Sequence, residues 1–208
     1  MKILSTIAWL RWIAGVALMC AWSAGAWATT VIPPSFEQLV NESDYIIRAV
    51  VKSVTSEYRT GAGGKTIITK VALDVREVIA GTPPAEVVLE ILGGKIGDEQ
   101  MVLEGAPRFK VGDEDILFVQ GNGRTIVPLV AMMHGRYPVV REPGTGRRYM
   151  ARENKVPLSD PAEVAQPMAG RGPAIQRAEQ IPAQAMTPEE FVQQIKAAVN
   201  PNYVHAKP

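Results

Sequence analysis

Apolar and polar residues alternate along most of the chain between residues 44 and 150. In 44–58 the apolar residues first occupy odd positions, and after Lys52 they shift to even positions, beginning at Val54. The period of two predicts a long strand, and the change of parity predicts a bulge within it. Segment 65–79 has the clearest alternation, with Ile67, Val71 and Leu73 facing the core. The two segments flank a glycine-rich loop and predict a hairpin.

Shorter strands are predicted at 86–92, 116–119, 125–130, 137–141 and 147–150, with glycine-containing turns between them. Segment 116–119 is apolar at every position, which is typical of a strand buried on both faces, as where a barrel closes or a helix lies across it. The sequence therefore predicts a mainly β fold, a small antiparallel OB-like barrel of about five to seven strands.

Two helices are predicted, one at each end of the barrel sequence. Ser35 and Gln38 form a capping-box pattern at the start of 35–42, and Thr187 and Glu190 form another at the start of 187–200. The second helix has one apolar stripe that includes Phe191. Such a short helix is marginal alone in water, so we expect it to dock, either on its own domain or on a partner.

Residues 1–28 have the pattern of a signal peptide: a basic start, an apolar run and small residues that end at Ala28. We expect cleavage after Ala28, a periplasmic or secreted protein, and no stable membrane span after cleavage. An uncleaved membrane anchor is the alternative. Residues 29–153 are expected to form the β-barrel domain, 154–186 a flexible linker rich in Pro, Ala and Gln, and 187–200 the C-terminal helix.

Cleavage would change the composition. It would remove all four tryptophans and the one cysteine, Cys20, and would leave 20 basic residues (22 less Lys2 and Arg11) against 21 acidic ones. A near-neutral chain gives no electrostatic basis for binding nucleic acid. Without cysteine it has no disulfide and no Cys nucleophile.

Glycine is concentrated in segment 93–119, around which the other strands are arranged. Glycine at so many fixed points indicates positive φ or a close approach of the backbone. We interpret Gly93, Gly94, Gly97 and Arg108 as a candidate partner surface, with Arg108 in solvent. In the alternative interpretation these glycines serve only hairpin turns and a bulge.

No residue is predicted to be catalytic, cofactor-binding or metal-binding. His134 follows two methionines, a grouping that could attract a soft metal, but we expect apolar packing with an exposed histidine. The acids at 98–99 and 113–115 are expected to be solvated turn carboxylates. Four arginines make the last hairpin basic (Arg136, Arg141, Arg147 and Arg148), and together with the acidic loop they form opposed patches that suit protein contacts.

Three stretches of the sequence resemble a set of exported bacterial proteins of unassigned function: SDYIIRAVVKSV, TKVALDVREVIAG, and LGGKIGDE with GAPRFKVGDEDILFV. The order of elements is also similar to that of the netrin-like OB barrels, which include the tissue inhibitors of metalloproteinases. The resemblance implies an OB-like barrel, a fold that hosts many functions. Those inhibitors chelate zinc with an N-terminal cysteine, whereas the expected mature chain begins at Thr29.

From these features we expect an exported, non-enzymatic binding or accessory protein that acts through its barrel loops. Its partner is expected to be another exported protein. Two alternatives remain: an inhibitor or chaperone of a co-exported protease, and a hydrolase.

Overall fold

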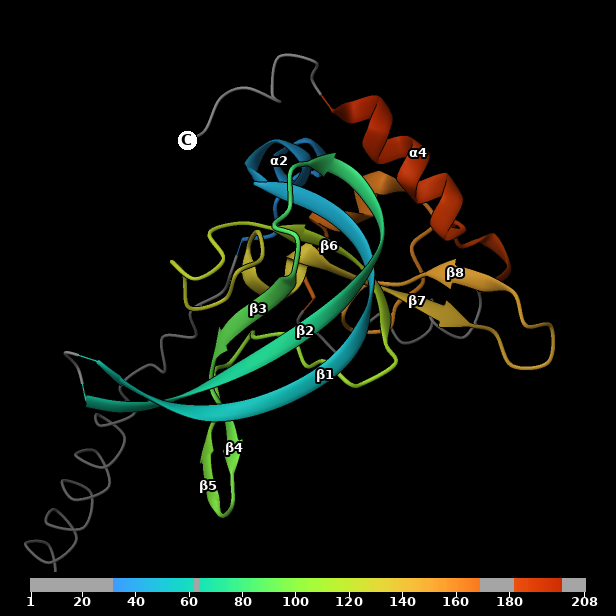
Figure 1. The fold of residues 1–208 in the computed structure, drawn as a ribbon. Coiled ribbons are helices and arrows are strands. Elements are labelled where there is room, and N and C mark those ends of the chain that lie inside the picture. The colour runs from blue at the N-terminus through green and yellow to red at the C-terminus, as the bar shows by residue number, and fades with distance from the viewer. Residues whose placement is uncertain (1–31, 62–63, 169–181, 200–208) are drawn as a thin grey trace, which may run out of the picture. The chain divides into compact units, whose positions relative to one another are not determined.

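Two long strands, β1 (Tyr45–Gly61) and β2 (Gly64–Gly81), form the main ribbon of the fold. They come from a computed structural model that describes residues 32–61, 64–168 and 182–199. The strands pair antiparallel from end to end, and both curve strongly (Figure 1). Three register shifts interrupt the pairing, one of them between Val51 and Ser53. An extra residue bends a strand, so the predicted bulge is confirmed and contributes to this curvature.

The other strands extend the ribbon on both sides. β3 (Val87–Leu92) pairs with β2, and β6 (Glu114–Val119), β7 (Arg136–Arg141) and β8 (Arg148–Met150) follow β1 in the order β3-β2-β1-β6-β7-β8. A separate hairpin consists of β4 (Gly94–Ile96) and β5 (Glu99–Met101). All these pairings are antiparallel, so the predicted mainly β, antiparallel fold is confirmed.

The irregular segment 120–130 follows β6 in the chain and lies in space between β3 and β6. The sequence predicts a strand at 125–130, but the described pairing there is a single bridge between Val119 and Leu129. The segment is held from both sides, because Val130 N donates to Phe118 O at 3.0 Å and Leu92 N donates to Ile126 O at 2.8 Å. The predicted strand is therefore wrong. The described strands do not close a barrel by themselves, and this segment bridges the opening between them.

β6 is buried on both faces, as its sequence predicts. Ile116 and Phe118 belong to an apolar cluster that includes both helices, which we call the helix-side core. Leu117 and Val119 belong to a second cluster inside the curved β1–β2–β3 sheet, which we call the barrel core. All four side chains are completely buried. One short strand thus forms the wall shared by two cores.

Both predicted helices are present with their capping boxes. α2 (Phe36–Glu42) begins after Ser35, whose hydroxyl accepts a hydrogen bond from the backbone N–H of Gln38. α4 (Pro188–Ala198) begins after Thr187, which accepts from Glu190 N in the same way. The described residues also form three short 3-10 turns: η1 (Met132–Gly135), η2 (Pro161–Ala165) and η3 (Pro182–Gln184). The two helices lie on the same side of the sheet (Figure 1).

Helix α4 docks on its own domain. The ring of Phe191 is fully buried, 5.2 Å from the ring of Tyr137 and 6.2 Å from that of Phe118, centroid to centroid. At the start of the helix Glu189 pairs with Arg48 at 3.1 Å. Burial of apolar side chains supplies most of the stability of such a docked helix. Of the two expected docking sites, the structure shows the one within the chain.

The described parts of the expected linker, 154–168 and 182–186, pack against the fold. Leu158 and Val164 are completely buried in the helix-side core. The Arg147 guanidinium donates to the carbonyls of Pro182 and Ala185, at 2.5 and 2.6 Å. These residues therefore belong to the folded unit, whereas composition alone indicates a flexible connection. Their few apolar side chains are spaced too irregularly to form a helical or strand-like pattern.

Several predictions fall outside the described residues. These are the signal peptide 1–28 with its cleavage site and the middle of the expected linker at 169–181. Within the described ranges, no helix is long and apolar enough to cross a membrane.

Replacing Phe191 with alanine should destabilise the protein by about 3–5 kcal/mol, because the change removes a fully buried ring and leaves a cavity. The exposed Gln194 on the same helix offers a control. Its replacement by alanine should change the free energy of unfolding by less than about 0.5 kcal/mol. Urea denaturation measures both. A small loss for Phe191→Ala would mean that α4 does not contribute to the core.

Candidate functional site

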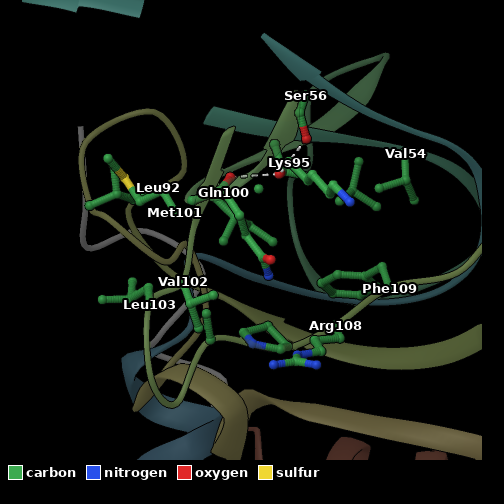
Figure 2. Close-up of a pocket in the computed structure, with 17 residues that line it drawn as sticks. Val54, Ser56, Leu92, Lys95, Gln100, Met101, Val102, Leu103, Arg108 and Phe109 are labelled. Carbon is green, nitrogen blue, oxygen red and sulfur yellow. Dashed lines mark hydrogen bonds between the residues drawn. The ribbon is translucent and has the colours of Figure 1, made fainter. Parts of the chain in front are cut away.

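A pocket of about 320 Å³ opens beside the β4–β5 hairpin, which lies far from α2 and α4 (Figure 1). One wall is the ribbon of β1 and β2, another is the β4–β5 hairpin, and the third is the loop that follows β5 (Figure 2). Its apolar lining continues the barrel core. The lining residues are Val54, Ser56, Thr69, Val71, Ile91, Leu92, Gly93, Gly94, Lys95, Gln100, Met101, Val102, Leu103, Ala106, Pro107, Arg108 and Phe109.

Gly94 allows the hairpin to lie directly on the ribbon. It has a φ of +140°, and a Cβ there would lie 2.3 Å from Thr69 Oγ1 and 2.5 Å from Ser56 Oγ. Thr69 Oγ1 donates to the carbonyl of Gly93 at 2.6 Å, so the Ser56 hydroxyl, 3.1 Å away, is the donor to Thr69. This short chain of hydrogen bonds, drawn dashed in Figure 2, fixes the base of the hairpin to the strands beneath it.

The structure brings together three of the four residues of the candidate partner surface. Gly93, Gly94 and Arg108 line the pocket, and Arg108 is exposed as expected. Gly97 does not line it: this residue lies in the turn between β4 and β5, with open space around its Cα and a φ of +57°. Gly93 and Gly94 shape the wall through their backbone, so their part in the pocket is architectural.

Sequence reasoning missed two polar residues of the pocket, Lys95 and Gln100. Both lie on the hairpin and both are exposed. In Figure 2 the amide end of Gln100 extends into the space that Lys95, Arg108 and Phe109 surround. Among the described residues, neither the Lys95 nor the Arg108 side chain forms an ion pair. The lining as described contains no acidic side chain to neutralise these two cations.

A buried arginine supports the wall that carries Arg108 and Phe109. The Arg136 guanidinium lies 4.3 Å from the centre of the Phe109 ring and donates to the carbonyl of Arg108. The same guanidinium forms a two-point contact with Asp115, through Nε at 2.9 Å and Nη2 at 3.1 Å. Asp113 lies at 2.7 Å from Nη2. Phe109 is half-buried between this cation and the barrel core.

The charged groups of this network shift one another's pKa values. Burial raises the pKa of Asp115 to about 6, although the Arg136 charge opposes that shift. Burial also raises the pKa of Glu153, which pairs with Arg136 at 3.2 Å. For Arg136 burial favours a lower pKa, but the charges of Asp115 and Glu153 outweigh it and the pKa is raised. Arg136 therefore stays charged while it holds three acids and the pocket wall in place.

The expectation of solvated turn carboxylates at 113–115 is wrong. Asp115 is completely buried, and the half-buried Asp113 and Glu114 are both paired, Asp113 with Arg136 at 2.7 Å and Glu114 with Arg48 at 2.7 Å. Glu114 also lies 3.5 Å from Arg148. The predicted acidic and basic patches thus meet within the fold and neutralise each other in part. Residues that are separate in sequence become neighbours because β6 pairs with β7.

His134 also differs from its expected exposed position. It is buried in η1, its Nδ1 has no described hydrogen-bond partner, and it does not line the pocket. Burial lowers the pKa of His134 to about 4, and the nearby charge of Arg152 adds to this shift. The described ranges contain no cluster of three or more His, Cys, Asp or Glu side chains arranged to hold a metal ion.

A second pocket of about 300 Å³ adjoins the first on the β4–β5 hairpin. The two share Gln100 and Met101, and Tyr58 Oη donates to Glu99 across the second pocket at 3.0 Å. The hairpin therefore stands between two concave surfaces. Comparison of the chain with protein families, curated proteins and solved structures finds no match.

Replacing Arg136 with methionine should destabilise the protein by about 3–5 kcal/mol near neutral pH, because Asp115 would be left buried without its partner. The double variant Arg136→Met/Asp115→Leu should recover part of this loss. Thermal and urea unfolding at pH 7.5 measure both changes. A double variant less stable than Arg136→Met would show that Asp115 is not the group left uncompensated.

Stability should also fall with acidification because of His134. Its folded pKa of about 4 lies below its unfolded value, so the folded state takes up a proton less readily. The contribution of the neutral His134 ring to the free energy of unfolding is complete above about pH 6.5. It decreases by up to about 3 kcal/mol as the pH falls from 6.5 to 4. In His134→Gln this part of the pH dependence should be absent. The measurement is the free energy of unfolding of both proteins between about pH 4.5 and 7.5, a range that spans most of the titration between the two pKa values. Equal pH dependence in the two proteins would contradict this role of His134.

Proposed function

We propose that the protein is an exported, non-enzymatic binding or accessory protein that holds its partner in the pocket between the β1–β2 ribbon and the β4–β5 hairpin. The observation that carries this proposal is the combination within one pocket of an apolar lining and two cations that form no ion pair among the described residues. Pockets with mostly apolar walls and a few placed polar groups are typical ligand sites.

The pocket is supported from both sides. The hairpin is fixed to the ribbon by Thr69 and the Gly93 carbonyl. The opposite wall is fixed by the contact of Arg136 with the Arg108 carbonyl and the Phe109 ring. A surface that is already ordered loses little conformational freedom when a partner binds, which favours affinity. This construction supports a binding role for the loops.

Val102 and Val111 offer a matched test. Both are exposed, to 62% and 67%, but only Val102 lines the pocket. Val102→Asp would place a charge at the apolar rim, whereas Val111→Asp makes the same chemical change elsewhere. We expect Val102→Asp to weaken capture of the partner by about tenfold or more, and Val111→Asp to change it less than about twofold.

The measurement is a pull-down from periplasm or culture supernatant, with residues 29–208 as bait and quantitative mass spectrometry of the captured proteins. The same set should be enriched by the unchanged protein and by Val111→Asp, and depleted for Val102→Asp. If all three baits capture the same proteins in the same amounts, the partner does not use this pocket and the proposal fails.

A further inference from the structure

We propose that the pocket binds the C-terminal residue of a partner polypeptide, with the terminal carboxylate between Lys95 and Arg108 and an apolar last side chain on the pocket floor. This inference rests on the proposed binding function and adds the chemistry of the group that is recognised. Three observations carry it: the charge of the rim, the Gln100 amide, which has no hydrogen-bond partner among the described residues, and the nature and size of the floor.

The rim favours an anion. Lys95 on β4 and Arg108 on the loop after β5 are the two charged residues of the described lining, and both are cations. Both side chains are exposed and free of described ion pairs, so a ligand does not have to displace an internal partner. Arg108 can bind a carboxylate through two parallel hydrogen bonds, and Lys95 adds a point charge. The two cations thus favour an anionic group such as a carboxylate.

The Gln100 side chain favours a peptide group close to that carboxylate. Its amide offers donors and an acceptor and extends into the pocket (Figure 2). The neighbouring hydroxyls of Ser56 and Thr69 are engaged with each other and with the Gly93 carbonyl. A backbone amide, which also has one donor and one acceptor, can satisfy Gln100 on both sides. An alkyl chain would cover this amide without replacing its hydrogen bonds to water.

The floor favours an apolar side chain. Val71 and Ile91 are buried residues of the barrel core that line the pocket, and Phe109 forms its edge. The volume of about 320 Å³ lies at the lower end of the range for ligand sites, which suits about two residues of a chain. A C-terminal apolar residue presents a carboxylate, a peptide N–H and an apolar side chain from one Cα. These are the three groups that the pocket can bind.

Short peptides provide the probe. An acetylated pentapeptide ending in Ala-Leu with a free carboxylate is titrated into the ¹⁵N-labelled protein, residues 29–208, in parallel with the amidated peptide and with octanoate. We expect the free-acid peptide to shift the backbone NMR signals of Lys95, Gln100 and Phe109. Amidation should weaken binding by about tenfold, because it removes the charge that the two cations attract.

Matched variants identify the groups that read the peptide. The double variant Lys95→Gln/Arg108→Gln should weaken binding of the free-acid peptide by about tenfold and leave binding of the amidated peptide nearly unchanged. The control Lys52→Gln/Lys110→Gln removes the same charge from exposed positions outside the lining. It should change affinity by less than about twofold. Gln100→Ala should weaken both peptides, and octanoate much less.

Each other outcome overturns the inference. Equal binding of the free and amidated peptides would show that the cations do not read a carboxylate, and octanoate binding as tightly as the peptide would show that a lipid-like anion suffices. No signal shift at millimolar peptide would exclude the C-terminal residue as ligand. The proposed binding function would still stand in these cases if Val102→Asp alone lost capture of the partner, so the two failures can be told apart.

Discussion

The burial of β6 on both faces is the constraint on which the rest of the structure depends. Four successive apolar residues, 116–119, have no polar face to offer to water, so both sides of the strand must be covered. One side is covered by the curved ribbon and the other by α2 and α4. The long, bulged strands and the docked C-terminal helix therefore each cover one face of β6. Removing either cover would expose the strand that holds the other in place.

The buried charge of Arg136 links this core to the pocket. A guanidinium that is 1% exposed must have its hydrogen bonds satisfied by protein groups. Asp113, Asp115 and the Arg108 carbonyl provide them, and they come from the start of β6 and from the loop before it. The loop that forms one pocket wall is thus held by an electrostatic requirement of the core. A pocket supported in this way keeps its shape without a ligand.

Sequence patterns could predict most helices and strands of this fold, but not everything that each segment pairs with or packs against. Alternation predicts β1 and β2, the parity shift after Lys52 predicts the bulge, and two capping boxes predict the helix starts. The strand predicted at 125–130 is wrong, because a largely apolar segment after a glycine turn does not say whether a neighbouring strand edge is available. Composition likewise indicates a linker where Leu158 and Val164 are buried, since isolated apolar residues form no period.

For the candidate site, too, the sequence identified some of the pocket residues and missed others. Glycine marks Gly93 and Gly94 in the sequence because their backbone geometry excludes other residues, and the structure explains Gly94 by its contact with Ser56 and Thr69. Lys95 and Gln100 have no such mark, since an exposed lysine and an exposed glutamine are ordinary on any surface. Their position becomes informative only when Gly94 brings the hairpin down beside Arg108. The glycines build the pocket, and the unremarkable polar residues next to them carry the chemistry that a partner would meet.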